Sequence, residues 1–200
     1  KNLNIKDIKI DISQSTKELK IQTIIEGLVL GNYEFLRYKS EKNEEKTKNI
    51  QISIASSKKE KAKLEADLKK ALIICNSVNY TKDIVNSSPE DYYPQIMADD
   101  ALKIAQNNKN IECKIFGEDY LKEKSMNAML SVGIASPHES KLIHLTYKTK
   151  NPIAKIVLVG KGVTYDTGGM SLKRGDGMVS MKCDKAGAAT ILGVIQALGA

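Results

Sequence analysis

The sequence predicts an α/β protein, on three observations. Residues 50–55 alternate apolar and polar side chains, which is the period of a strand with one buried face. A long amphipathic pattern follows and indicates a single helix. From about residue 88 onward, strand and helix patterns alternate, as is typical of an α/β domain. We therefore divide the chain into a first region over 1–56, a linker helix over 57–87 and a larger α/β region over 88–200.

Capping and helix-breaking residues set the limits of the elements in the first half. Residues 16–30 predict a helix. Residues 39–49 carry charge and no apolar side chain, so they indicate a solvated loop. Ser57, followed three residues later by Glu60, starts the linker helix as a capping box. This helix must end before Pro89, because the residue before a proline is pushed out of helical geometry.

Strands and helices alternate in the second half. Pro94 suits the first turn of a helix, and strands are predicted over 111–116 and 142–147. Residues 156–159 are apolar at every position, as expected for a parallel strand covered on both faces. A helix of small residues is predicted over 187–198.

Composition and charge exclude several classes of protein. No apolar run approaches the length of about 20 residues that crosses a bilayer, so no membrane span is predicted. The net charge is +7, but the only arginines are Arg37 and Arg174. Proteins that bind phosphates and bases depend on the bidentate guanidinium of Arg. The charge therefore indicates a solvated, lysine-rich surface rather than a nucleic-acid partner.

Cysteine and histidine usage limits the kinds of metal site. An odd, sparse set of cysteines argues against a disulfide framework and fits a reducing cytoplasm. No C-x-x-C pair exists, and His138 and His144 do not form an H-E-x-x-H motif. Any metal ion in this chain must therefore be held mainly by carboxylates.

Residues 159–190 carry the strongest chemical signal. They hold seven of the thirteen glycines and begin where the predicted strand at 156–159 ends, which is where ligands bind in open α/β sheets. A phosphate cradle does not fit them. The P-loop spacing is absent, and G-x-G-x-x-G fails because its last position is Tyr165.

A carboxylate metal site is the second interpretation, with Lys161, Asp166, Asp176 and Asp184 as candidates. Divalent ions that drive hydrolysis prefer hard oxygen ligands and an open position for water. The candidates also have structural alternatives: Asp166 as a turn residue, Asp184 as a helix N-cap and Lys161 as a surface lysine. Spacing alone leaves these alternatives open.

The same segment resembles the first active-site segment of the leucine (cytosol) aminopeptidase family of two-metal aminopeptidases. The family pattern is V-G-K-G-x-T-x-D-[ST]-G-G-x-x-x-K, then M-x-x-D-x-x-G-A-A, and residues 159–189 match it. Residues 26–39 and 83–89 resemble the end of the amino-terminal domain and the entry into the catalytic domain. The resemblance implies the end of an amino-terminal α/β domain, a long linker helix, and the first part of a mixed-sheet, zinc-peptidase-like α/β catalytic domain.

The resemblance assigns roles to five residues. Lys161 and Asp184 match ligands of one metal ion, and Asp166 matches the carboxylate between the two ions. Lys173 matches the catalytic lysine that polarises the scissile carbonyl. Met181 matches a residue that lines the pocket for the first side chain of the substrate. Asp176 matches no ligand, and we treat it as a loop residue.

The function implied is that of a metallo-exopeptidase, a hydrolase of intracellular peptide turnover. It would release amino-terminal, preferentially leucine-like residues from peptides with a free N-terminus. Two divalent ions per active site, Zn²⁺ or Mn²⁺, and a bicarbonate ion as proton shuttle are implied. Family members are cytoplasmic and form homo-hexamers, so the same is expected here.

Two departures from the family pattern carry expectations. The later N-T-D-A-E-G-R segment, which supplies another Asp, a Glu and an Arg, is absent. We therefore expect the chain to be part of a longer polypeptide, to carry half of the active site, and to be inactive alone. Lys185 stands where Met is usual, which predicts a positive charge near the metals or on the helix flank.

A non-catalytic DNA- or protein-binding module on the same scaffold is the alternative function. Its DNA affinity would fall steeply with salt, because phosphate contacts release counterions. Its function would not depend on metal.

Overall fold

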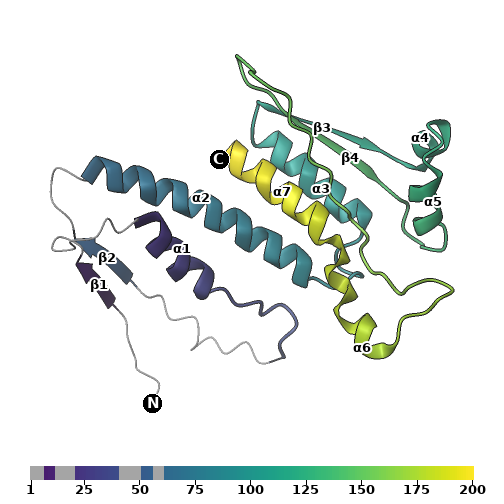
Figure 1. Cartoon of the computed structure of the whole chain (residues 1–200), viewed down its shortest axis with the longest axis horizontal. Coiled ribbons are helices and arrows are strands. Elements are labelled where there is room, and N and C mark those ends of the chain that lie inside the picture. Colours follow the sequence, from purple (N-terminus) through teal and green to yellow (C-terminus); the bar gives the residue numbers. More distant parts are fainter. Residues whose placement is uncertain (1–6, 12–20, 41–50, 56–60) are drawn as a thin grey trace. The chain divides into compact units, whose positions relative to one another are not determined.

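The computed structural model describes residues 7–11, 21–40, 51–55 and 61–200. The chain divides into two compact units between Asn76 and Ser77. This boundary falls inside the long helix α2 (Lys61–Asn86), so each unit contains part of that helix (Figure 1). The α/β class is confirmed, whereas the limits predicted for the domains and the linker helix stay a prediction.

A parallel strand pair and helix α1 form the first unit. Strands β1 (Asp7–Asp11) and β2 (Gln51–Ala55) pair from Asp7 opposite Gln51 to Asp11 opposite Ala55. Parallel strands need a crossover connection, and α1 (Ile21–Gly31) lies between them in the sequence. The predicted strand at 50–55 is thus confirmed over 51–55.

Several predictions for this half fall outside the described residues. They concern the start of the helix predicted over 16–30, most of the charge run at 39–49, and the capping box of Ser57 and Glu60. The helical part that is described, α1, ends at Gly31, near which the sequence predicts the end of the helix.

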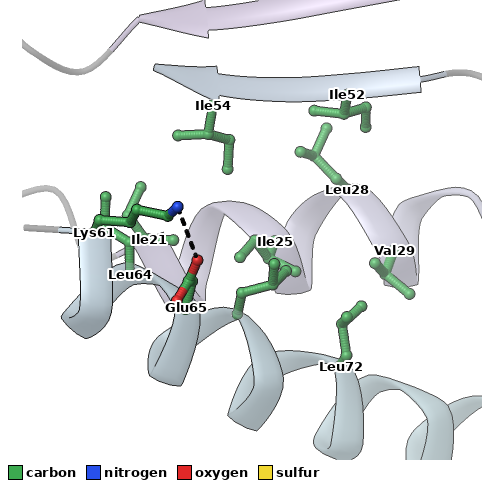
Figure 2. A pocket seen from close by; sticks show the side chains of 11 residues that line it. Ile21, Ile25, Leu28, Val29, Ile52, Ile54, Lys61, Leu64, Glu65 and Leu72 are labelled. Atoms are coloured by element: carbon green, nitrogen blue, oxygen red, sulfur yellow. Dashed lines mark ion pairs between the residues drawn. The ribbon is translucent and has the colours of Figure 1, made fainter. Parts of the chain in front are cut away.

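An apolar cavity of about 410 Å³ lies in the first unit between α1, β2 and α2 (Figure 2). At its rim, Lys61 Nζ lies 3.8 Å from Glu65 Oε1. Both side chains are exposed, so this pair contributes little to stability. The lining is otherwise aliphatic, and it consists of Ile21, Ile25, Leu28, Val29, Ile52, Ile54, Leu64, Leu68 and Leu72.

Helices α2, α3 (Pro94–Gln106) and α7 (Ala186–Gly199) supply most of the core of the second unit. Helices α3 and α7 lie side by side (Figure 1). Helix α2 ends before Pro89 and α3 begins at Pro94, as predicted. Thr81 Oγ1 of α2 donates to Ala189 O of α7 at 3.3 Å, which joins these two helices. The buried residues of this core are Ile84, Tyr92, Met97, Ala101, Ala189 and Leu192.

Strands β3 (Ile111–Phe116) and β4 (Leu142–Tyr147) pair antiparallel on the same unit. Both strands have the predicted limits. Short helices α4 (Glu118–Glu123) and α5 (Asn127–Gly133) lie between them in the sequence.

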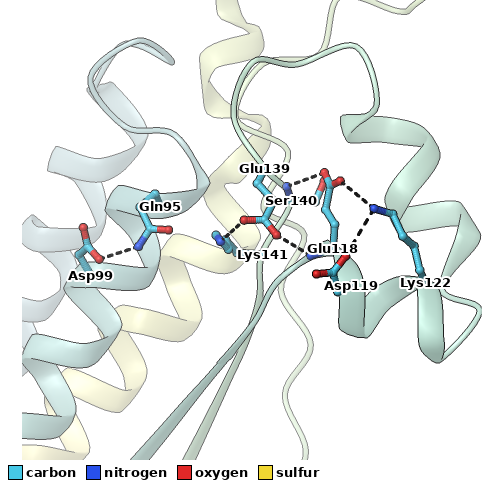
Figure 3. Close-up of polar contacts among 8 residues, drawn as sticks. All are labelled: Gln95, Asp99, Glu118, Asp119, Lys122, Glu139, Ser140 and Lys141. Atoms are coloured by element: carbon cyan, nitrogen blue, oxygen red, sulfur yellow. Dashed lines mark hydrogen bonds and ion pairs between the residues drawn. The ribbon is translucent and has the colours of Figure 1, made fainter.

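A carboxylate from the loop before β4 caps helix α4 (Figure 3). Glu118 N donates to Glu139 Oε1 at 2.7 Å, and Ser140 N donates to Glu118 Oε1 at 3.2 Å. A carboxylate is favourable at a helix N-terminus, where backbone N–H groups lack intrahelical partners. The hydrogen bond from Lys141 and that from the backbone of Glu118 lower the pKa of Glu139. These contacts fix the return of the chain into β4.

The strand predicted at 156–159 is not present among the described residues. This segment has no ladder partner, and Ile156 and Val159 are 81% and 91% exposed. The prediction of a parallel strand covered on both faces is therefore wrong for this structure. A strand forms only where a neighbour satisfies its backbone N–H and C=O groups, and in the described part of the chain β3 and β4 pair with each other alone.

Among the residues described, no helix has both the length and the apolar character needed to cross a bilayer.

Candidate metal centre

The glycine-rich segment packs its backbone against the start of α7. Ala188 N donates to Lys161 O at 2.8 Å. A Cβ on Gly160 would lie 2.6 Å from Gly187 O, and a Cβ on Gly187 would lie 2.8 Å from Lys161 N. Such distances leave no room for a side chain at either position. The glycines therefore permit the close approach that brings Lys161 beside the first turn of α7.

Lys161 and Asp184 form an ion pair at this contact. Lys161 Nζ donates to Asp184 Oδ1 at 2.8 Å and lies 2.6 Å from Oδ2. The hydrogen bond to Asp184 is the main cause that raises the pKa of Lys161. Lys185, not Asp184, is the N-cap residue of α7, and no side-chain hydrogen bond caps the helix. Of the alternatives left open above, the N-cap role of Asp184 is thus wrong.

Asp166 is both a turn residue and an ion-pair partner. Its Oδ1 accepts a hydrogen bond from Gly168 N at 2.9 Å, in a turn where Gly168 has a φ of 86°. Its Oδ2 accepts from Lys173 Nζ at 2.8 Å. The bond from Lys173, followed by that from Gly168, lowers the pKa of Asp166. Lys173 Nζ also lies 2.9 Å from Met181 Sδ.

The structure brings the five predicted site residues together. The two ion pairs are electrostatically linked, because the charge of Asp166 also raises the pKa of Lys161. Met181 and Asp184 come from the 3₁₀ helix η3 (Val179–Lys185), which precedes α7. Their roles in catalysis stay predictions. Asp176, expected in a loop, lies instead in the short helix α6 (Gly175–Met178).

The donor set fits a hard divalent cation but is small. Asp166 and Asp184 supply hard carboxylate oxygens, and each carboxylate is paired with a lysine ammonium. Among the described residues, no group of three or more His, Cys, Asp or Glu side chains lies close enough together to hold a metal ion. Lys161 would have to lose its proton to add an amine ligand. Two carboxylates and one amine are too few to complete two coordination shells.

Sequence reasoning missed the surroundings of Lys185. Its side chain is fully buried, and its Nζ donates to Ser87 O at 2.9 Å and to Lys182 O at 2.8 Å. Burial, together with the charge of Lys182, lowers the pKa of Lys185 to about 8. The helix-flank alternative is corrected, because the side chain is buried, whereas a charge near the metals stays a prediction. The signal was present in the helical spacing, which places Lys185 on the buried face of Ala189 and Leu192.

Comparisons with known proteins agree on one family. The model of the cytosol aminopeptidase family, catalytic domain, matches residues 79–200. A probable cytosol aminopeptidase of Campylobacter jejuni is 44% identical over 98% of this chain and 41% of its own length. A probable cytosol aminopeptidase of Wolinella succinogenes is 41% identical over 88% of this chain and 37% of its own. The chain thus spans about two fifths of the length of these relatives.

A solved structure shows the same fold. The bottromycin maturation enzyme BotP in complex with Mn superposes with a TM-score of 0.81 at 24% identity, over 97% of this chain and 40% of that one. The fold, the match over residues 79–200 and the identity to these relatives agree. The chain belongs to the cytosol aminopeptidase family.

Proposed function

We propose that this chain provides the first half of the active site of a metal-dependent aminopeptidase. The enzyme would hydrolyse peptides that have a free N-terminus and release leucine-like residues preferentially. The observation that carries the proposal is the gathering of Lys161, Asp166, Lys173 and Asp184 as two linked ion pairs. Family membership supports this interpretation of the cluster.

Lys161, Asp166 and Asp184 are the residues that would hold the metal ions. Lys161 and Asp184 would share one ion, and Asp166 would lie between two. Divalent ions such as Zn²⁺ or Mn²⁺ supply Lewis-acid polarisation and a water of lowered pKa when bound. The contact between Lys161 and Asp184 supports this role, because it places an amine and a carboxylate side by side.

Lys173 would position and polarise the substrate carbonyl. Its ammonium is held by Asp166 at 2.8 Å and is about one third exposed, so it is fixed in direction and still reachable. A pre-positioned cation stabilises the negative charge that develops on the carbonyl oxygen. The thioether of Met181, 2.9 Å from the same ammonium, would line the pocket for the first side chain.

The remaining parts of the site and assembly belong to the same proposal. Further Asp, Glu and Arg residues outside these 200 would complete the ligand set, with a bicarbonate ion on the Arg. The complete protein would act in the cytoplasm as a homo-hexamer.

The test compares Lys173→Ala and Asp166→Ala with Lys148→Ala in the complete polypeptide. Lys148 pairs with Glu112 on β3, outside the site, and is a matched control for the loss of a lysine ion pair. We expect kcat for a chromogenic leucine amide to fall by about 10²–10³-fold in each site variant, with an unchanged circular dichroism spectrum. Lys148→Ala should keep its activity. Unchanged kinetics in either site variant would rule out the assigned roles.

A further inference from the structure

Two lysines of η3 bind the carboxyl end of helix α2. Lys182 Nζ donates to Asn86 O at 3.2 Å, and Lys185 Nζ donates to Ser87 O at 2.9 Å. The last carbonyl groups of a helix lack intrahelical partners and carry partial negative charge. Two ammonium groups therefore suit this position both as hydrogen-bond donors and as charges.

Lys185 also holds η3 itself in shape. Its Nζ donates to Lys182 O at 2.8 Å, so one fully buried ammonium joins the end of α2 to the turn that carries Asp184. An ion taken out of water loses a large part of its solvation free energy. A buried lysine whose known acceptors are both backbone carbonyls is thus an unfavourable choice for packing alone. An apolar side chain of the same length, such as Met, would fill the space without that loss.

Hydrogen bonds hold the chain on both sides of Asp184. On one side, Lys182 and Lys185, which flank it in the sequence, fasten η3 to α2. On the other side, Ala188 N fastens the start of α7 to Lys161 O at 2.8 Å. These contacts therefore fix the position of the Asp184 carboxylate relative to α2 and to Lys161.

We propose that Lys185, assisted by Lys182, is a positioning residue that fixes the Asp184 carboxylate for metal binding. This inference rests on the proposed function. Residues outside the first coordination shell tune metal sites by orienting the ligands, and their loss typically lowers affinity by about 10–100-fold. Lys185 would orient Asp184 from outside the coordination shell, because it fixes the backbone of η3, which carries this ligand.

The experiment compares Lys185→Met with Leu192→Ala in the complete polypeptide. Met has a similar length and fits the apolar part of the slot, but it removes the hydrogen bonds that Lys185 donates to Ser87 O and Lys182 O. Leu192 is buried on the same face of α7 and lies beyond the turn, so its truncation reduces packing alone. Lys182→Met serves as a weaker variant of the same kind, because its bond is longer.

Two measurements test the effect of Lys185→Met on metal binding and on the η3 backbone without measuring turnover. Titration calorimetry of the metal-free protein with Mn²⁺ gives the Kd, and native hydrogen exchange gives the protection of the amides of residues 179–188. We expect Lys185→Met to raise the Kd by at least about tenfold and to speed exchange in this segment. Leu192→Ala should lower the free energy of unfolding and leave the Kd of the folded protein within about twofold of the parent.

The outcomes separate the two proposals. A Lys185→Met protein whose Kd and exchange both match the parent would overturn the positioning role. If the parent protein binds no Mn²⁺ at all, the proposed function fails and with it the role in metal binding. Faster exchange in Lys185→Met would then show that Lys185 holds the turn for another purpose.

Discussion

At the scale of single residues, the candidate centre is balanced in charge. Two lysine ammonium groups face two carboxylates, and each carboxylate has an ammonium within 2.8 Å. A cation that enters must therefore displace ammonium groups that already satisfy Asp166 and Asp184. These ion pairs hold the two carboxylates in place.

The glycines beside Lys161 lead to a prediction at the same scale. Replacing Gly187 with Ala would put a Cβ 2.8 Å from Lys161 N, so the backbone must shift. We expect the free energy of unfolding to fall by about 1–3 kcal/mol. Urea unfolding of the complete polypeptide measures the change. Gly175→Ala is the matched control, since a Cβ there meets nothing within 4 Å. Equal stability of the two variants would refute the close approach.

At the scale of elements, a buried polar cluster joins α2 to α3. Tyr92 Oη donates to Asp100 Oδ2 at 2.9 Å, and Tyr80 Oη lies 3.5 Å from the same oxygen. Lys103 Nζ donates to Asp100 Oδ1 at 3.0 Å. Burial raises the pKa of both tyrosines, and the negative charge of Asp100 raises them further. The cluster holds the end of the long helix against the helix that follows it.

This cluster predicts a loss of stability at alkaline pH. The tyrosines ionise near pH 10 in the unfolded chain and only at higher pH in the folded one. Their contribution is therefore complete below about pH 10 and is lost as the pH rises further. We expect the free energy of unfolding to fall as the pH rises above about 10, and to fall less in Tyr92→Phe. The appearance of tyrosinate absorbance for these residues at pH 10 in a natively folded protein would contradict this prediction.

At the scale of the whole molecule, the chain exposes apolar surface around the glycine-rich segment. Ile153, Val157, Met170 and Val179 are each more than 70% exposed. Such surface indicates a site of interaction. Because the relatives are more than twice as long as the part that this chain matches, we expect further polypeptide to cover it.

A prediction about activity follows from the small ligand set. The 200 residues alone should release no leucine from a chromogenic leucine amide, with or without added Mn²⁺. The site described here offers two carboxylates and one amine, which cannot complete two coordination shells. The complete polypeptide, assayed in parallel, is the positive control. Metal-dependent turnover by the 200 residues would show that the site needs no further ligands.

The sequence by itself determined the features that depend on local chemistry. Pro89 and Pro94 mark the gap between α2 and α3, because a proline restricts the residue before it and suits a first helical turn. The strands predicted over 111–116 and 142–147 have the limits of β3 and β4. The motif residues of 159–189 identified the candidate site, because their spacing in the chain is itself the signal.

Only the tertiary structure decided the features that depend on distant segments. The apolar run at 156–159 reads as a buried strand, yet a strand needs a neighbour whose presence no local pattern reveals. The sequence predicts Lys185 as a charge near the metals or on the helix flank, yet its side chain is buried and bonds to Ser87, 98 residues earlier in the chain. Propensities act over a few residues, whereas burial and ion pairing are set by which remote segments meet.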